Sequence, residues 1–204
     1  MNTLVIGPGG NLSRAAETIR RGGLVAVPTE TVYGLCCDGS NESAVDRLFE
    51  TKGRPEGKPI SLLVSGALQA ERSCGYMTPA ARKLAEAFWP GPVTLVIDRR
   101  PGTSDRLAAG GDTIGVRCPG NTLALRLAYM SGRPLAAPSC NPSGAPSAVD
   151  ADMALGYFGG AIECVIDGGK CRIGVESTVV SVTRDGIRIL RAGAIPEEAI
   201  WRAI

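Results

Sequence analysis

Short apolar runs rich in valine, leucine and isoleucine alternate along this chain with segments of helical periodicity, and this alternation constrains the fold most strongly. Asp185-Gly186 has the composition of a hairpin turn between the last two runs. Interleaved helices together with a hairpin predict an α+β (mixed α/β) fold, a twisted mixed sheet flanked by helices. We predict strands at LVAVP (24–28), ISLLV (60–64), VTLVI (93–97), TIGVR (113–117), PLAAP (134–138), IECVID (162–167), STVVSV (177–182) and IRIL (187–190).

Helix boundaries are indicated by capping residues, glycines and prolines around the amphipathic segments. Thr78-Pro79 is the clearest start, because a threonine cap precedes proline at the first helical position. Four other helices are predicted. The first begins at a Ser13 cap and ends at Gly22-Gly23, and the second begins at Asn41 or Ser43 and ends near Gly53. The third runs from near Asn121 to Gly132, and the last begins at Pro196.

The composition restricts both the class of protein and its chemistry. Hydrophobic residues make up 44% of the 204 residues and the net charge is +2, which is typical of a globular chain. No segment approaches the roughly 18 apolar residues of a membrane span, and the N-terminus lacks the features of a signal peptide. With no linker composition in the chain, we expect one cytoplasmic domain, residues 1–204.

The chain has no histidine, which excludes Ser-His-Asp and Cys-His catalysis. Its seven cysteines include no C-x-x-C pair, so they predict neither a zinc site nor a disulfide scaffold, and buried reduced thiols are expected. The chemistry must therefore use other polar side chains, backbone amides, or a metal ion held largely by substrate phosphates.

Two stretches near the N-terminus have residues suited to ligand binding. PTETVYGL (28–35) places two threonine hydroxyls and a tyrosine after a strand, where open α/β sheets bind ligands, although a Thr-rich turn is an equal alternative. KGRPEGKP (52–59) carries Lys52, Arg54 and Lys58 on a stiff loop, which suits either a polyphosphate or a solvated basic surface.

Further candidates follow later strands. Arg117 ends an apolar strand and needs an anionic partner, which can be a structural carboxylate or a substrate carboxylate. APSCNPSGAPS (137–147) offers hydroxyls and an amide that can hold a ribose or phosphate, or can simply form turns. Within it Cys140 is either a nucleophile or a small packed residue. VESTVV supplies Ser177, and ILRAGA supplies Arg191.

Taken in order, these stretches from residue 12 to about 200 resemble the YrdC-like family of L-threonylcarbamoyladenylate synthases. The resemblance depends on seven motifs in family order: PTETVYGL, the K-x-R of KGRP, WPGPVTLV, VRCP, the S-x-N of PSCNPSG, GVESTVV and LRAGAI. It implies a single YrdC-like domain whose sheet and helices surround an open, concave, basic groove. It also implies that L-threonine, bicarbonate and ATP give L-threonylcarbamoyladenylate and pyrophosphate, and that a transferase complex then modifies the adenosine next to the anticodon of tRNA.

The resemblance also implies the roles of individual residues. Lys52 and Arg54 would be catalytic and hold the ATP phosphates, Arg117 would take the threonine carboxylate, and Mg²⁺ would be held mainly by ATP rather than by protein ligands. Further ATP contacts would be Lys58, Thr113, Ser139, Asn141, Ser147 and Arg191, and further threonine contacts would be Thr31, Leu63, the backbone of Ala137, and Ser177.

Three features depart from the family pattern. Leu63 stands about where some members carry a histidine near the threonine, and Cys140 replaces a small residue inside the S-x-N motif. The chain also stops near AIWRAI, so we expect the short form without a further C-terminal domain.

Two other functions remain open for such a chain. One is a non-catalytic module of the same fold that binds double-stranded RNA or tRNA through a basic concave surface. The few aromatic residues, 4%, argue against recognition of single strands by base stacking. The other is a carbamoyl-transfer domain of a hydrogenase-maturation protein, against which the absence of zinc-finger C-x-x-C pairs argues.

Overall fold

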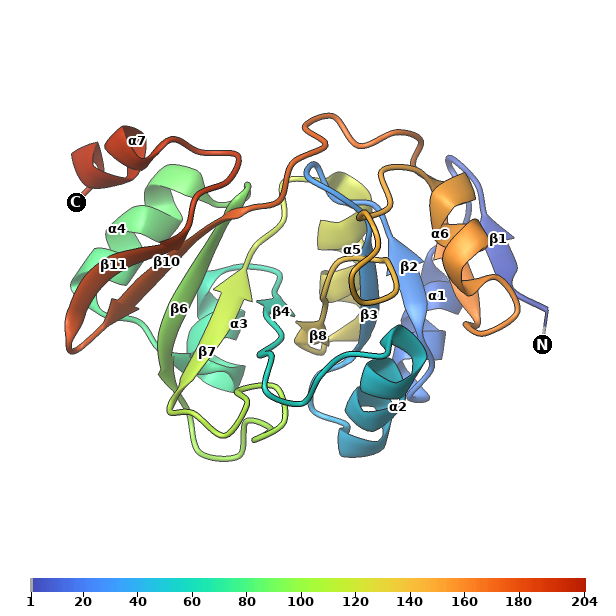
Figure 1. Cartoon of the computed structure of the whole chain (residues 1–204), viewed down its shortest axis with the longest axis horizontal. Helices are drawn as coiled ribbons and strands as arrows, with labels where there is room; N and C mark the ends of the chain where they lie inside the picture. The colour runs from blue at the N-terminus through green and yellow to red at the C-terminus, as the bar shows by residue number, and fades with distance from the viewer. Residues whose placement is uncertain (1) are drawn as a thin grey trace.

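The computed structural model describes residues 2–204, which form seven helices and an eleven-stranded mixed sheet (Figure 1). The strands are β1 Leu4–Ile6, β2 Val25–Val27, β3 Gly34–Asp38, β4 Leu62–Leu63, β5 Gly75–Tyr76, β6 Val93–Arg99, β7 Thr113–Arg117, β8 Leu135–Ala136, β9 Cys164–Ile166, β10 Thr178–Thr183 and β11 Gly186–Arg191. The helices are α1 Ser13–Arg20, α2 Glu42–Lys52, α3 Ala67–Ser73, α4 Pro79–Phe88, α5 Thr122–Ser131, α6 Ala151–Phe158 and α7 Glu197–Arg202.

The sheet confirms the predicted mixed α/β class. Its strand order is β1-β9-β2-β3-β8-β4-β7-β6-β10-β11, with β5 paired to β6 outside this path. The pairs β1/β9, β2/β9, β4/β7 and β6/β10 are parallel, and the remaining pairs are antiparallel. Strands distant in sequence therefore become neighbours, which brings the ends of β4, β6, β7 and β10 to one region.

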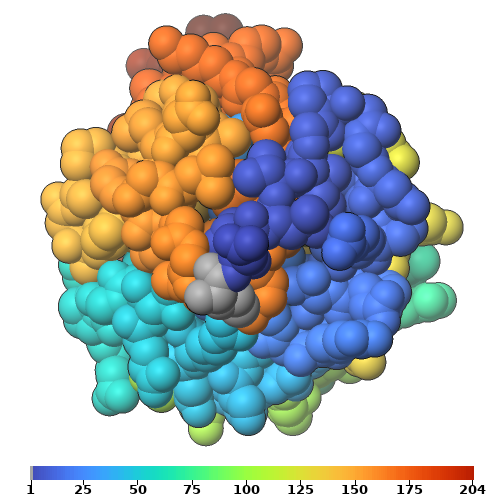
Figure 2. Space-filling model, turned by 90° about the vertical axis from the view of Figure 1, so that its right-hand side faces the viewer, coloured from blue at the N-terminus to red at the C-terminus, as the bar shows by residue number. Residues whose placement is uncertain are grey.

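Helices pack near both ends of the sheet, and Figure 1 shows α3 and α5 behind the strands between them. Helices α1, α2 and α6 lie around β1–β3 and β9, whereas α4 and α7 lie beside β10 and β11. Helix α5 packs against α1. Figure 2 shows the N-terminal residues in blue against the orange segment near residue 160, as the β1/β9 pairing requires.

Every predicted strand is present, but several elements were not predicted. These are β1, β3, β5, α3 and α6. Strand β3 is buried at all five positions, so it lacks the alternation of apolar and polar residues that indicates a strand. The threonine-rich segment before it is also typical of a loop. Strand β1 has only three residues and depends on pairing with β9, which lies far away in the sequence.

The predicted helix starts are confirmed at most positions. The side chains of Asn41 and Thr78 accept the cap hydrogen bonds of α2 and α4, from the backbone amides of Ala44 at 3.2 Å and Ala81 at 3.1 Å. Gly53 ends α2 with φ of 61°, a left-handed conformation that favours glycine. Pro196 is the residue that caps α7.

The prediction that Ser13 caps the first helix is wrong. Ser13 is already the first helical residue, and Leu12 occupies the capping position without a side-chain hydrogen bond. The side-chain oxygen of Asn11 instead accepts a hydrogen bond from the Ser13 amide at 2.9 Å. Leu12 is 1% exposed, so burial of its side chain rather than capping fixes this helix start.

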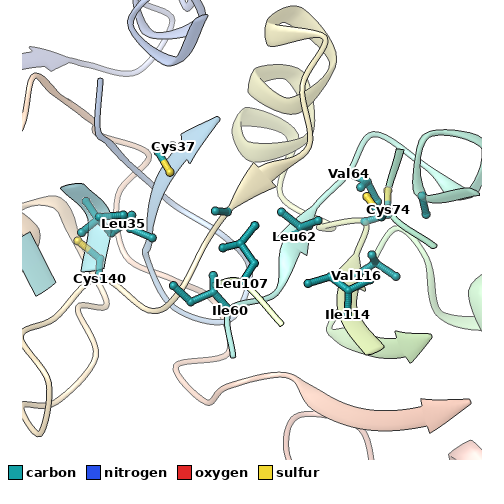
Figure 3. Close-up of a cluster of buried hydrophobic side chains, with 14 of the residues drawn as sticks. Leu35, Cys37, Ile60, Leu62, Val64, Cys74, Leu107, Ile114, Val116 and Cys140 are labelled. Carbon is teal, nitrogen blue, oxygen red and sulfur yellow. The ribbon is translucent and has the colours of Figure 1, made fainter. Parts of the chain in front are cut away.

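The larger of two hydrophobic clusters includes side chains of the central strands (Figure 3). Leu62, Ile114 and Val116 project from β4 and β7 into it, and Ile60 lies beside Leu107. All seven cysteines are buried free thiols, as the sequence predicts, and Figure 3 shows Cys140 beside Leu35. Within residues 2–204 no helix is long and apolar enough to cross a membrane.

We expect Leu84→Ala to lower the free energy of unfolding by about 3 kcal/mol, because Leu84 of α4 is fully buried and its truncation leaves a cavity. Leu68→Ala is the matched control, because Leu68 of α3 is 61% exposed, and its change should stay below about 0.5 kcal/mol. Urea unfolding of both variants checks this, and equal losses would contradict the assignment of the core.

Candidate functional site

A cavity of about 510 Å³ lies where β4, β6, β7 and β10 approach the loops after β2 and β8. Three arginines line it, together with hydroxyls from six separate segments of the chain. The predicted site residues that line this cavity are Thr31, Arg54, Leu63, Thr113, Arg117, Ala137, Ser139, Ser177 and Arg191. Residues spread over 160 positions of sequence thus meet in one place.

The alternation of side chains along β7 arranges one wall of the cavity. Thr113, Gly115 and Arg117 share a face of this strand, so all three line the cavity. Gly115 between them is required by close approach, because a Cβ there would overlap the Ser61 hydroxyl. The wall therefore has a hydroxyl at one end, a guanidinium at the other, and Ser61 over its middle.

Arg117 is buried and its anionic partner is a structural carboxylate, Glu30. Arg117 Nη2 donates to Glu30 Oε1 at 2.7 Å, Nη1 donates to Thr31 Oγ1 at 3.0 Å, and Nε donates to the Gly91 carbonyl at 3.0 Å. The side chains of Arg117 and Glu30 are 8% and 7% exposed. Within residues 2–204, one N–H on each terminal nitrogen keeps no protein partner, so Arg117 can still donate to a ligand.

Glu30 stays ionised despite its burial. Burial by itself raises the pKa of Glu30, but the charge and hydrogen bond of Arg117 outweigh it and lower that pKa from 4.5. The second carboxylate oxygen accepts from the Asn121 amide at 3.1 Å, just before α5. Glu30 thereby joins the turn after β2 to β7 and to the start of α5.

Lys52, at the end of α2, contacts the S-x-N loop from behind. Its ammonium donates to the carbonyls of Ser139 at 2.5 Å and Asn141 at 2.6 Å, and to Asn141 Oδ1 at 3.1 Å. All three ammonium donors are therefore used, and Lys52 does not line the cavity. Burial, and secondarily the charge of Arg54, lower the pKa of Lys52 to about 8.

The S-x-N loop is held rigidly against the strands beside it. The Cys140 amide donates to the Tyr33 carbonyl at 2.8 Å, and the Ser139 hydroxyl donates to Asn141 Oδ1 at 2.6 Å. The Cys140 thiol is fully buried, and burial raises its pKa to about 12 although the charge of Lys52 acts in the opposite direction. Cys140 is thus a packed, protonated thiol and not an activated nucleophile.

Arg54 and Arg191 bring further positive charge to the cavity, from the loop after α2 and from the end of β11. Arg54 donates to the carbonyls of Lys58 at 3.1 Å and Pro59 at 2.8 Å. Arg191 donates to the Ser177 carbonyl through Nη2 at 2.9 Å and Nε at 3.3 Å, and its Nη1 pairs with Glu176. The Ser177 hydroxyl also shares a hydrogen bond of 2.8 Å with Thr94.

Four predicted contact residues lie outside the cavity lining. Lys52 donates to the S-x-N loop, and Asn141 within that loop accepts from Lys52 and Ser139 through its side-chain oxygen. Lys58 is exposed on its own loop, and Ser147 donates to Glu176 at 3.3 Å. Their roles toward substrate stay predictions, as do the roles of the residues that line the cavity.

Sequence reasoning missed Glu30, Glu176, Ser61 and Thr94 as residues in or around the site. A signal for Glu30 existed, because a buried Arg117 required a carboxylate and Glu30 stands inside the TETV motif. The other three residues follow strand pairing, which the sequence does not reveal.

Several arginines and hydroxyls that line one cavity of a mixed-sheet domain are groups with which proteins typically bind small anionic ligands. The family model described as Sua5_yciO_yrdC, "Telomere recombination", matches residues 17–193. This chain belongs to that family, which confirms the resemblance inferred from its motifs.

Individual relatives agree with this assignment. The threonylcarbamoyl-AMP synthase of Pyrococcus abyssi is 46% identical over 190 residues, covering 93% of this chain and 56% of the relative. The crystal structure of P. abyssi Sua5 complexed with L-threonine superposes with a TM-score of 0.94 at 42% identity, over 100% of this chain and 61% of that one. The E. coli YciO structure has a TM-score of 0.85 at 24% identity, covers 98% of this chain and 100% of that one, and supports the fold alone.

The chain spans about half the length of the first curated relatives that it matches. The activity, substrates and partners of those longer proteins are therefore proposals for this chain.

We expect Glu30→Gln to lower the free energy of unfolding by about 3 kcal/mol at pH 7, because it leaves the buried Arg117 charge without its counter-ion. The native pKa of Glu30 lies below its unfolded value of 4.5. The stabilisation from ionised Glu30 is thus complete above pH 4.5 and is lost as pH falls through the native pKa. The difference between wild type and variant should therefore shrink in acid.

The control is Glu17→Gln, which removes an exposed ion pair with Arg21 and should cost less than about 1 kcal/mol. Urea unfolding between pH 3 and 7 measures both variants. A Glu30→Gln deficit that stays constant with pH would show that the carboxylate charge is not what stabilises Arg117.

Proposed function

We propose that this chain makes L-threonylcarbamoyl-AMP from L-threonine, bicarbonate and ATP, releasing pyrophosphate. The observation that carries the proposal is that one cavity is lined both by residues predicted to bind threonine and by residues predicted to bind ATP. Relatives named threonylcarbamoyl-AMP synthase, at 46% and 41% identity over most of this chain, support it.

Threonine would bind at the Arg117 end of the cavity. The two free N–H groups of Arg117 suit a carboxylate, because a guanidinium offers planar paired donors. Thr31, Ser177 and the backbone of Ala137 would complete the polar contacts, and Leu63 would face the threonine methyl group. The L-threonine bound in the P. abyssi Sua5 structure supports threonine as the amino acid.

ATP would bind at the other end, with Arg54 and Arg191 beside its phosphates and Thr113 and Ser139 contributing hydroxyls. We propose that Lys52 acts through the S-x-N loop, holding Ser139 and Asn141 in place while adding positive charge from behind. Lys58 and Ser147 would join the nucleotide contacts from the rim.

The reaction needs no enzyme nucleophile. The threonine amine and bicarbonate give a carbamate and water, and a carbamate oxygen then attacks the α-phosphorus. The bond from that phosphorus to the pyrophosphate oxygen breaks, and pyrophosphate leaves with the electron pair of that bond. Catalysis would come from alignment of the two substrates in one cavity and from arginine charges that stabilise the phosphates. A chain without histidine is able to supply both effects.

Mg²⁺ would be held mainly by phosphate oxygens of ATP. Within residues 2–204, no three His, Cys, Asp or Glu side chains lie together as a metal site. ATP oxygens are ligands that Mg²⁺ accepts while keeping several waters, so this donor set fits a nucleotide-borne ion.

We further propose that residues 1–204 act as one domain and that the product passes to a transferase complex that modifies tRNA. A carbamoyl adenylate is an activated acyl donor, so an enzyme that transfers its acyl group must consume it. Direct binding of tRNA by the basic side of the cavity is a separate question that the same purified protein can answer.

We expect the purified chain to release pyrophosphate from ATP only when threonine and bicarbonate are both present. Lys52→Ala and Arg54→Ala should each lower that rate at least about 100-fold, because the first removes the ammonium that holds three acceptors of the S-x-N loop and the second removes a charge from the cavity. Arg72→Ala, on the exposed face of α3, is the control and should keep the wild-type rate.

Coupled pyrophosphate detection and chromatography of the adenylate product measure these rates with each of the twenty amino acids in turn. Pyrophosphate release that is independent of amino acid and bicarbonate would refute the proposed reaction. Wild-type rates in both Lys52→Ala and Arg54→Ala would refute the phosphate assignment alone.

A further inference from the structure

Glu176 is the only carboxylate among the described residues that line the cavity. It lies between two positions predicted to bind ATP, because Arg191 Nη1 donates to its Oε2 and the Ser147 hydroxyl donates to its Oε1 at 3.3 Å. Its side chain is 40% exposed, so it is not a buried structural ion. None of the proposed substrate contacts uses it.

The Glu176 carboxylate lies beside the cations that we propose to bind the ATP phosphates. Besides its contact with Arg191, Glu176 favours the charged forms of Lys52 and Arg54, because it acts to raise the pKa values that burial lowers. A negative group therefore stands where an incoming triphosphate would need the same cations. The two anions would compete for Arg191 at close range.

Arg191 is held in a way that lets one of its donors change partner. Its Nε and Nη2 donate to the Ser177 carbonyl, and Nη2 also donates to the Ser177 hydroxyl at 3.2 Å. Only Nη1 pairs with Glu176. The guanidinium can therefore stay in place while Nη1 exchanges a carboxylate for a phosphate oxygen.

The backbone of Glu176 is fixed, so the exchange involves its side chain alone. The Glu176 carbonyl accepts from the Ala194 amide at 3.0 Å, and a Cβ on Gly193 would overlap the same carbonyl. A half-exposed glutamate on a fixed backbone can rotate toward solvent without moving the strand that follows it.

We propose that Glu176 is an internal counter-anion that occupies Arg191 in the empty site and is displaced by a phosphate of ATP. This inference rests on the proposed function, since it takes the cavity to bind a triphosphate. Glu176 then positions Arg191 before binding, weakens the hold on ATP and pyrophosphate alike, and returns to Arg191 as pyrophosphate leaves. Binding energy that is equal for substrate and product slows release, so such an exchange favours turnover.

An alternative role for the same carboxylate would be to bind Mg²⁺ together with the phosphates. The two roles predict opposite effects of neutralising Glu176 on the affinity for phosphates. Neutralising a displaced counter-anion strengthens phosphate binding, whereas neutralising a metal ligand weakens it when Mg²⁺ is present.

Calorimetric titration of the full chain tests the proposal with three probes: pyrophosphate, ATP and adenosine, each with excess EDTA and, for the first two, with Mg²⁺. Glu176→Gln should bind pyrophosphate and ATP about fivefold more tightly than wild type in both conditions, since a partly exposed pair contributes up to about 1 kcal/mol. Adenosine, which lacks phosphate, should bind both proteins equally. In turnover the KM for ATP should fall while the KM for threonine is unchanged.

Glu86→Gln is the matched control, because Glu86 is exposed on α4 and lies outside the cavity, and it makes the same change in net charge. Its affinities should equal those of wild type. Equal or weaker phosphate binding by Glu176→Gln, with wild-type protein binding ATP and turning it over, would overturn the counter-anion and leave the proposed function intact. Failure of wild type itself to bind ATP and pyrophosphate would overturn both.

Discussion

The buried ion pair between Arg117 and Glu30 is the interaction on which the site depends. It connects the turn after β2 to the end of β7, and through the Asn121 amide it reaches the start of α5. Two charges removed from water stabilise a structure only when their remaining hydrogen bonds are satisfied. Here Thr31 and the Gly91 carbonyl satisfy part of the guanidinium, and the rest of it faces the cavity.

A second cation, Lys52, has a mainly structural role. Its ammonium is fully used by the S-x-N loop, so the charge reaches the cavity through a rigid backbone and not through direct exposure. Arg191 is held in part by the protein, since Ser177 fixes it while one nitrogen pairs with the half-exposed Glu176. The cations around the cavity thus differ in how directly a ligand can reach them. Lys52 is fully occupied by the protein, whereas Arg191 has one nitrogen whose partner can be exchanged.

Much of this arrangement could be predicted from the sequence, because the evidence for it is local. Apolar runs, the Thr78-Pro79 start and the Asp185-Gly186 turn each contain the signal for their own structure, and the motifs identified the segments that meet at the cavity. What could not be predicted depends on long-range pairing or burial. Strand β3 is buried on both faces, Leu12 starts α1 by packing where Ser13 was expected to cap it, and Glu176 meets Ser147 only in the folded chain.

Arg117→Lys tests most directly whether one cavity holds threonine at Arg117 and ATP beside Arg54 and Arg191, because it keeps the charge beside Glu30 but removes the planar fork. We expect the KM for threonine to rise about tenfold or more while the KM for ATP stays within about twofold, given the usual strength of a charged hydrogen bond. Arg126→Lys, exposed on α5, controls for the exchange itself. A rise confined to the KM for ATP, or an equal rise in both, would show that Arg117 does not bind the threonine carboxylate.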